Sequence, residues 1–142
     1  MRFEHAVVIA ASADTVWKVL IDVESWPELT ASMTSVDQVD PGPLVVGTTV
    51  RIKQPKLPVT EWVVTECVEG QRFVWESTNG GVKTRAVHSV VQAVGSATLR
   101  LEIEQSGLLS PVIGMLFGQM THRYLDMEAR GIKARAEGSP SG

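Results

Sequence analysis

Hydrophobic and polar residues alternate along most of the chain up to Gln105, which is the pattern of half-buried β-strands. The first expected strand covers residues 3–9, and one of its faces carries Phe3, His5, Val7 and Ile9. Proline and glycine residues mark the later turns, and Asn79-Gly80-Gly81 is a strong hairpin signal. From about Met33 onward the pattern predicts an antiparallel meander of six strands, the clearest of which lie around Val50, at 59–68, around Phe73, at 82–93 and at 97–105.

Two short helices are expected between the first strand and this meander. Ser12 is a good cap for the first of them, which has apolar positions at Val16, Trp17, Leu20 and Ile21. The second covers residues 22–29 and is broken near Trp26-Pro27, because the residue before a proline avoids the helical region. Together they form a lid-like insertion after an edge strand.

A long helix is expected at the end of the chain. Ser110 can cap it, Pro111 is favoured at its first position, and it would run to about Ala136. One face carries apolar side chains at helical spacing: Ile113, Leu116, Phe117, Met120, Tyr124 and Met127. A helix of this length spans about 39 Å, and a compact domain of this size is about 37 Å across. The helix should therefore cross the whole molecule.

The sixth expected strand decides which way His88 faces. The charged residues Lys83 and Arg85 belong in water, so His88 on the opposite face should point inward. A two-residue turn at Gly95-Ser96 agrees, because it would pair His88 with Ile103 of the next strand. A three-residue loop would reverse the two faces.

The chain has 142 residues, which predicts a single domain at residues 1–137 and a disordered polar tail at 138–142. Its net charge of -3 and pI near 5.6 argue against a nucleic-acid partner, which needs a basic face. The single cysteine, Cys67, cannot form an internal disulfide. We find no signal peptide and no apolar segment long enough to span a bilayer, so we expect a cytoplasmic protein without stable membrane insertion.

The segment 9–17, followed by Asp22 and Trp26-Pro27, resembles the opening of the polyketide cyclase/dehydrase and lipid-transport family, part of the START-like or Bet v 1-like superfamily. Further residues fit this family in the same order: Gly47-Thr48, Val64-Thr65-Glu66, Arg72-Phe73-Val74-Trp75 and Ile132-Lys133. The likeness covers about residues 3–136.

The resemblance implies an α+β helix-grip fold. In such a fold a curved seven-stranded antiparallel sheet wraps around the long C-terminal helix, and two short helices follow the first strand. An apolar, ligand-binding cavity between the sheet and the helix is part of what the resemblance implies. It carries over no catalytic residue.

Motifs for the common cofactors and metals are missing from the sequence. The chain has no glycine-rich phosphate loop, no HExxH, no CxxC and no GxSxG elbow. The histidines His5, His88 and His122 are far apart and lack metal-ligand spacing. We therefore expect neither a cofactor nor a metal site.

Two residues on the inward faces could carry chemistry. His88 could move a proton to or from a carbonyl, because imidazole titrates near neutral pH. Alternatively, it is a buried neutral histidine with a structural partner. Tyr124 could bond a ligand oxygen, or its hydroxyl could reach a partner on the sheet as part of the core.

Apolar side chains around these two residues would form the wall of a ligand site. Trp62, Phe73 and Trp75 should lie near one another on adjoining strands, where they could stack on a flat ligand or simply fill the core. The full set of expected ligand-binding residues is Trp62, Phe73, Trp75, His88, Leu101, Phe117, Met120 and Tyr124.

Polar residues outside this set have structural interpretations. His122 lies four residues before Asp126, which predicts a surface pair, and His5 is expected to be structural. Glu66 would face inward in a regular strand, where an unpaired charge is costly, unless a bulge near Cys67 turns it outward.

Gly114 and Gly118 lie on one side of the long helix and weaken its first half. They could give a flexible entrance beside the apolar Gly107-Leu108-Leu109 loop. They could also allow close packing against the two short helices or another subunit.

The leading hypothesis is binding or transport of a small hydrophobic ligand, such as a lipid, an isoprenoid or an aromatic polyketide-like molecule. The first alternative is a cyclase or dehydratase on the same scaffold, with His88 as general acid/base and Tyr124 polarising a carbonyl. The second is a protein-interaction module that uses an exposed apolar edge or the face with Gly114 and Gly118, a homodimer being one form of it.

Overall fold

The computed structural model of the chain describes residues 2–138, except for the side chains at positions 113, 114 and 116. The elements in chain order are β1 (Arg2–Ile9), α1 (Ala13–Ile21), the 3₁₀-helix η1 (Val23–Ser25), α2 (Trp26–Leu29), β2 (Ser35–Gln38), β3 (Thr49–Lys53), β4 (Thr60–Val68), β5 (Arg72–Asn79), β6 (Val82–Ala93), β7 (Ser96–Ser106) and α3 (Ser110–Gly138).

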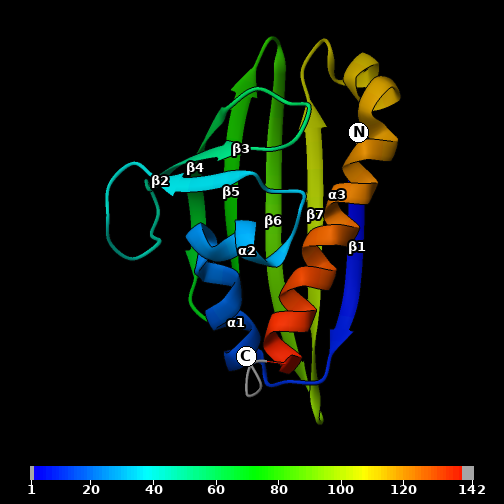
Figure 1. Ribbon diagram of the computed structural model, residues 1–142. Coiled ribbons are helices and arrows are strands. Elements are labelled where there is room, and N and C mark those ends of the chain that lie inside the picture. The colour runs from blue at the N-terminus through cyan, green and yellow to red at the C-terminus, as the bar shows by residue number, and fades with distance from the viewer. Residues whose placement is uncertain (1, 139–142) are drawn as a thin grey trace.

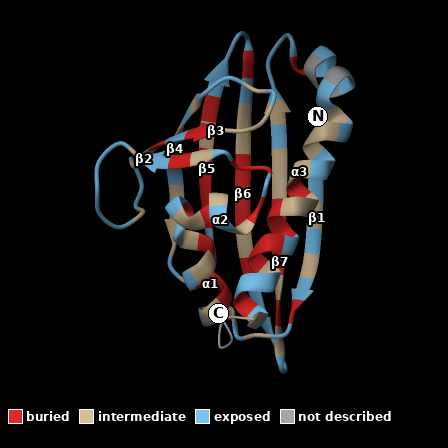
Figure 2. Ribbon diagram, in the orientation of Figure 1, coloured by how far each residue is buried: buried red, intermediate tan, exposed pale blue. Residues whose placement is uncertain are grey.

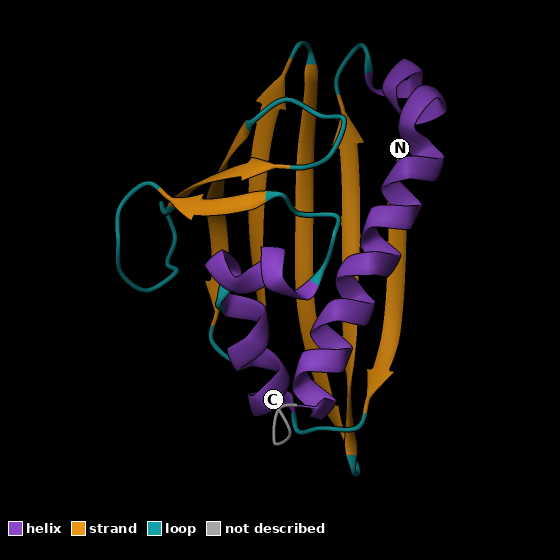
Figure 3. Ribbon diagram, in the orientation of Figure 1, coloured by secondary structure: helices purple, strands orange, loops and turns teal. Residues whose placement is uncertain are grey.

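The strands form one antiparallel sheet in the order β1-β7-β6-β5-β4-β3-β2. The sheet is strongly curved, so that β2 and β3 run across the direction of β5 and β6 (Figure 1). Helix α3 lies in the concave side along β7 and β1, and α1 and α2 close the lower end (Figure 3). The predicted helix-grip fold is confirmed.

Local sequence explains the two short helices. The Ser12 hydroxyl accepts a hydrogen bond from the Thr15 backbone N–H and caps α1, which buries Val16, Trp17 and Leu20. The predicted second helix is divided where the sequence suggested, with η1 ending at Ser25 and α2 beginning at Trp26. A proline fits the second helix because it lies in the first turn, where an N–H has no helical partner.

A β-bulge in β4 turns Glu66 toward solvent. The pairing of β4 with β5 shifts between Val64 and Glu66, which leaves Thr65 as an extra residue. Glu66 then pairs with Arg72 on the outer face of the sheet. The inward orientation expected of Glu66 in a regular strand is therefore wrong, and the bulge alternative is correct.

The hairpin between β6 and β7 has a different turn from the predicted one. Ala93 pairs with Ser96, so the turn residues are Val94 and Gly95, and Gly95 takes a positive φ of 71°. His88 consequently pairs with Leu101 rather than with Ile103. The shift is two residues, which preserves the face of each side chain, and His88 points inward as predicted.

Helix α3 is buried unevenly along its length (Figure 2). Its second half carries the buried residues Leu125, Glu128, Ala129, Ile132 and Ala136. Its first half is more exposed. The predicted inward positions Ile113 and Leu116 lie outside the described side chains.

The end of α3 extends beyond the predicted Ala136. Helical structure continues through Glu137 to Gly138, and positions 139–142 lie outside the described residues. The Lys133 ammonium donates to the Val8 carbonyl at 3.1 Å, and the Glu137 carboxylate accepts from the Ala10 N–H at 2.8 Å. These two bonds attach the last turns of the helix to the end of β1.

The packing of α3 on its neighbours corrects two further predictions. Asp126 contacts His5 of β1 at 3.2 Å and Arg130 at 2.9 Å, whereas His122 packs edge-on against the Phe3 ring. The predicted pair between His122 and Asp126 is therefore wrong, because β1 supplies a partner to each of them.

The close approach between helices also lies elsewhere than predicted. An added Cβ at Gly131 would lie 2.4 Å from the Leu29 carbonyl oxygen of α2. At Gly118 it would meet the Phe3 side chain of β1 at 3.5 Å, an ordinary contact. Gly114 lies outside the described side chains. Gly131, which sequence reasoning did not single out, is the glycine that allows α2 to pack closely against α3.

No helix in the described part of the chain is long and apolar enough to cross a membrane.

Candidate functional site

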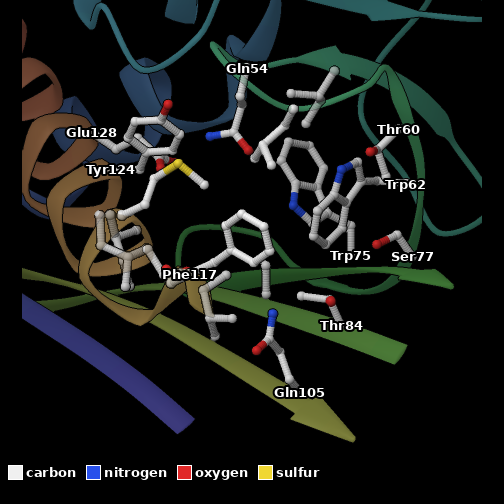
Figure 4. A pocket seen from close by; sticks show the side chains of 18 of the residues that line it. Gln54, Thr60, Trp62, Trp75, Ser77, Thr84, Gln105, Phe117, Tyr124 and Glu128 are labelled. Carbon is white, nitrogen blue, oxygen red and sulfur yellow. Dashed lines mark hydrogen bonds between the residues drawn. The ribbon is translucent and has the colours of Figure 1, made fainter. Parts of the chain in front are cut away.

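A cavity of about 360 Å³ lies between α3, over residues 117–128, and the concave face of the sheet. Its walls come from β3 to β7, from the loop between β3 and β4, and from α3. Aliphatic and aromatic side chains provide most of the lining, among them Met33, Ile52, Leu57, Trp62, Trp75, Ala86, Leu101, Phe117 and Met120. Polar side chains lie between them, including Gln54, Thr60, Ser77, Thr84, Tyr124 and Glu128 (Figure 4).

Most of the predicted site residues surround this cavity. They are Trp62, Trp75, His88, Leu101, Phe117, Met120 and Tyr124. Phe73 does not belong to the lining. Its ring is fully buried and lies 6.3 Å from Trp17 of α1 and 6.4 Å from Trp26 of α2. The placement of Phe73 in the ligand wall is therefore wrong, because the short helices cover it and make it core.

Two tryptophans form an aromatic wall on one side of the cavity. The rings of Trp62 and Trp75 are 6.1 Å apart, and Figure 4 shows them across the cavity from Tyr124 and Glu128. The neighbouring Trp26 donates its indole N–H to the Leu20 carbonyl at 3.1 Å. In the part of the chain that the structure describes, the indole N–H groups of Trp62 and Trp75 have no hydrogen-bond partner.

His88 lies within an aromatic cluster at the base of the cavity. Its ring stacks on Phe73 at 4.2 Å, and Nδ1 lies 3.3 Å from the Phe73 carbonyl oxygen. Burial lowers the pKa of His88 to about 4, because the surroundings disfavour the charged ring. At neutral pH the imidazole is therefore neutral, with one nitrogen held against the backbone.

Tyr124 connects the long helix to the loop between β3 and β4. Its hydroxyl donates to the Pro55 carbonyl oxygen at 2.7 Å. Lys53, at the end of β3, also stabilises this loop, because its ammonium donates to the Gln54 and Leu57 carbonyls. The Tyr124 hydroxyl therefore uses its only proton within the protein.

Glu128 is a cavity residue that sequence reasoning missed. It is only 7% exposed, and burial raises the pKa of its carboxyl to about 8. Among the described residues it has no hydrogen-bond or ion-pair partner. Its position could have been found from spacing, because it lies one turn beyond Tyr124 on the same helix face.

Phe117 stands where the cavity meets solvent. It lines the cavity and is nevertheless 38% exposed. Nearby apolar side chains on the same end of the molecule are also exposed, including Leu108 at 96% and Met115 at 81%. The Gly107-Leu108-Leu109 loop at this end is apolar, as expected from the sequence.

Within residues 2–138, no group of three or more His, Cys, Asp or Glu side chains could hold a metal ion.

The chain matches a known protein family over nearly its whole length. The family model described as "Polyketide cyclase / dehydrase and lipid transport" matches residues 1–137. Comparison with curated proteins gives no match.

Solved structures share the fold at low sequence identity. The Zhui aromatase/cyclase from Streptomyces sp. R1128 is 16% identical, with a TM-score of 0.79 over 99% of this chain and 95% of that one. A START superfamily protein from Mycobacterium smegmatis is 17% identical, with a TM-score of 0.73 over 94% and 97%. Norcoclaurine synthase from Thalictrum flavum, in complex with dopamine and hydroxybenzaldehyde, is 18% identical, with a TM-score of 0.73 over 94% and 84%.

Proposed function

The chain belongs to the polyketide cyclase/dehydrase and lipid-transport family, and from this premise we propose that it binds a small hydrophobic molecule in the cavity beside α3. One observation carries the proposal, which is the mainly apolar and aromatic lining of that cavity. Ligand sites are typically hollows of this kind with a few placed polar groups. Binding would come from apolar surface that leaves water, at roughly 25 cal/mol per Å² before ordering costs.

The size of the cavity limits the ligand. A volume of about 360 Å³ lies near the lower end of the range of roughly 300 to 1,000 Å³ for small-molecule sites. A compact molecule of a few rings or a short isoprenoid fits this volume better than a long diacyl lipid. The two neighbouring indoles on one wall favour a flat molecule, because aromatic rings stack with an offset on one another.

The enzymatic alternative, a cyclase or dehydratase with His88 as general acid/base, has less support. A histidine with a pKa of about 4 is a weak base at neutral pH, and efficient proton transfer needs a pKa near the working pH. Tyr124 was expected to polarise a carbonyl, but its proton is donated to Pro55. We therefore place binding ahead of catalysis.

Native mass spectrometry of the protein purified from its own host tests the proposal. The expected result is a co-purified small molecule that survives gentle ionisation. The variant Ala86→Phe, which places a ring in the cavity lining, should lose this molecule. Ala6→Phe is the matched control, because Ala6 is exposed on β1 and should retain it. Equal ligand content in the two variants would contradict the proposed site.

A further inference from the structure

One polar group of the cavity has no partner in the described part of the chain. The Glu128 carboxyl lies between the buried residues Leu125, Ala129 and Ile132 of the same helix and still belongs to the cavity lining. A buried polar group without a hydrogen bond is costly, so natural proteins usually supply a partner. In Figure 4 the side chain of Glu128 lies beside Tyr124, on the opposite side of the cavity from the two tryptophans.

Among residues 2–138, no cation forms an ion pair with this carboxyl. Arg123 of the same helix has no ion-pair partner in this range, but its side chain is exposed to solvent. On β1, His5 contacts Asp126, and on α2, Glu28 contacts Arg135. Within α3, Arg130 and Lys133 pair with carboxylates one turn away.

In the part of the chain that the structure describes, the other elements around the cavity also supply no charged partner to Glu128, and Lys56 of the β3–β4 loop is exposed to solvent. Lys53 beside the β3–β4 loop donates to backbone carbonyls, and the ring of His88 on β6 is neutral at neutral pH. Glu102 of β7 pairs with Arg2 on the outer face. Burial without a compensating cation raises the pKa of Glu128 to about 8, so its carboxyl keeps a proton at neutral pH.

A protonated carboxyl donates one hydrogen bond. The opposite wall offers the indole N–H groups of Trp62 and Trp75, which are donors only and have no partner among residues 2–138. The Glu128 carboxyl and the two indoles are therefore donors on opposite sides of the cavity. A ligand that satisfies them needs acceptor oxygens and no positive charge, because an ammonium group would require two desolvated charges in an apolar site.

We propose that Glu128 anchors the ligand by donating a hydrogen bond from its carboxyl group, and that the cavity selects neutral, flat aromatic molecules that carry carbonyl or similar acceptor oxygens. This inference rests on the proposed function and specifies the class of ligand. It assigns to Glu128 the orienting role that the sequence suggested for His88 and Tyr124.

Three shape-matched naphthalenes test the inference. They carry an acetyl, an isopropyl or an aminoethyl group at the same ring position, and so differ in having an acceptor, no polar group or a cation. Isothermal titration calorimetry would measure their affinities at about pH 6.5 and about pH 9.5, on either side of the pKa of Glu128. The proteins are the unmodified chain, Glu128→Gln and Glu128→Leu.

The acetyl compound should bind the unmodified chain roughly threefold to tenfold more tightly than the isopropyl compound at the lower pH. This preference should disappear at the higher pH, where the carboxyl has lost its proton. Glu128→Gln keeps an N–H donor that does not titrate, so the preference should persist at both pH values. Glu128→Leu should abolish it at both.

Two results would overturn the inference while leaving the proposed function intact. One is tightest binding of the aminoethyl compound. The other is a preference for the acetyl compound that survives in Glu128→Leu. If the unmodified chain binds none of the three compounds, the inference fails, whereas the proposed function is decided separately by the co-purified molecule in mass spectrometry.

Discussion

The Tyr124 hydroxyl and the Pro55 carbonyl oxygen, 2.7 Å apart, join the long helix to the loop that covers one side of the cavity. The bond links positions 69 residues apart in sequence. It is therefore a tertiary contact that must break if the loop is to move away from the helix.

The first prediction concerns this contact. Tyr124→Phe keeps the ring and removes the donor, so the loop at 54–58 should open more often. Hydrogen exchange at the amides of Gln54, Lys56 and Leu57 should become faster, and unfolding free energy should fall by about 0.5 to 1.5 kcal/mol. Unchanged exchange in the loop would show that Lys53 alone holds it.

The second prediction separates core from cavity wall. Phe73→Ala should cost roughly 3 to 5 kcal/mol of unfolding free energy, because it leaves a hole beneath Trp17 and Trp26. Trp62→Ala should cost less stability, because Trp62 is only half-buried and borders space that is already empty. Denaturant titration of both variants gives the comparison, and a greater loss at Trp62 would contradict the assignment.

The third prediction uses the pKa of His88. His88 takes up a proton near pH 6.5 in the unfolded chain, but only near pH 4 in the folded chain. The unfolded state therefore binds more protons in this window, and the His88 contribution to stability is lost as the pH falls from 6.5 to 4. Relative to His88→Gln, the unmodified chain should lose roughly 3 kcal/mol across that range in chemical denaturation.

The fourth prediction has the opposite sign. The pKa of Glu128 is raised from 4.5 to about 8, so the folded state binds more protons between these values. Stability from this group is complete below pH 4.5 and is lost as the pH rises toward 8. Glu128→Gln should remove this slope and should exceed the unmodified chain in stability above about pH 8. Parallel stability profiles for the two proteins between pH 5 and pH 8 would count against a buried, protonated carboxyl.

The fifth prediction pairs two glycines of α3. Gly131→Ala should destabilise, because the new Cβ would lie 2.4 Å from the Leu29 carbonyl oxygen and α2 would have to shift. Gly118→Ala makes only an ordinary contact with Phe3, so it should stabilise the helix by up to about 1 kcal/mol. Thermal unfolding of the two variants should therefore move in opposite directions.

The strands and helices could be predicted from the sequence because their strongest patterns are local, whereas the helix-grip arrangement was implied by the resemblance to a known family. Alternation marks the long strands, Asn79-Gly80-Gly81 marks a hairpin, and a continuous apolar stripe marks α3. The exact register of β6 and β7 was harder to predict from the sequence, because Gly95 fits either a Val94-Gly95 turn or a Gly95-Ser96 turn. The shift by two residues preserved the inward face of His88.

The site was harder to predict because burial depends on distant elements. Phe73 and Trp75 face the same way on β5 and both contact Trp26 of α2, yet only Trp75 borders the cavity, whereas Phe73 also packs against Trp17 of α1. Glu128 was missed because a glutamate on a helix is ordinarily assigned to solvent. Only the position of α3 against the curved sheet turns it toward the cavity.

The attachment of the last turns of α3 to β1 has a consequence for the solution behaviour of the protein. β1 is an edge strand, and the free backbone groups of an edge can recruit a strand from another molecule. Lys133 and Glu137 already occupy the Val8 carbonyl and the Ala10 N–H at the end of this strand. The helix that walls the cavity therefore also occupies backbone groups at one end of this edge, where they are no longer available to a strand of another molecule.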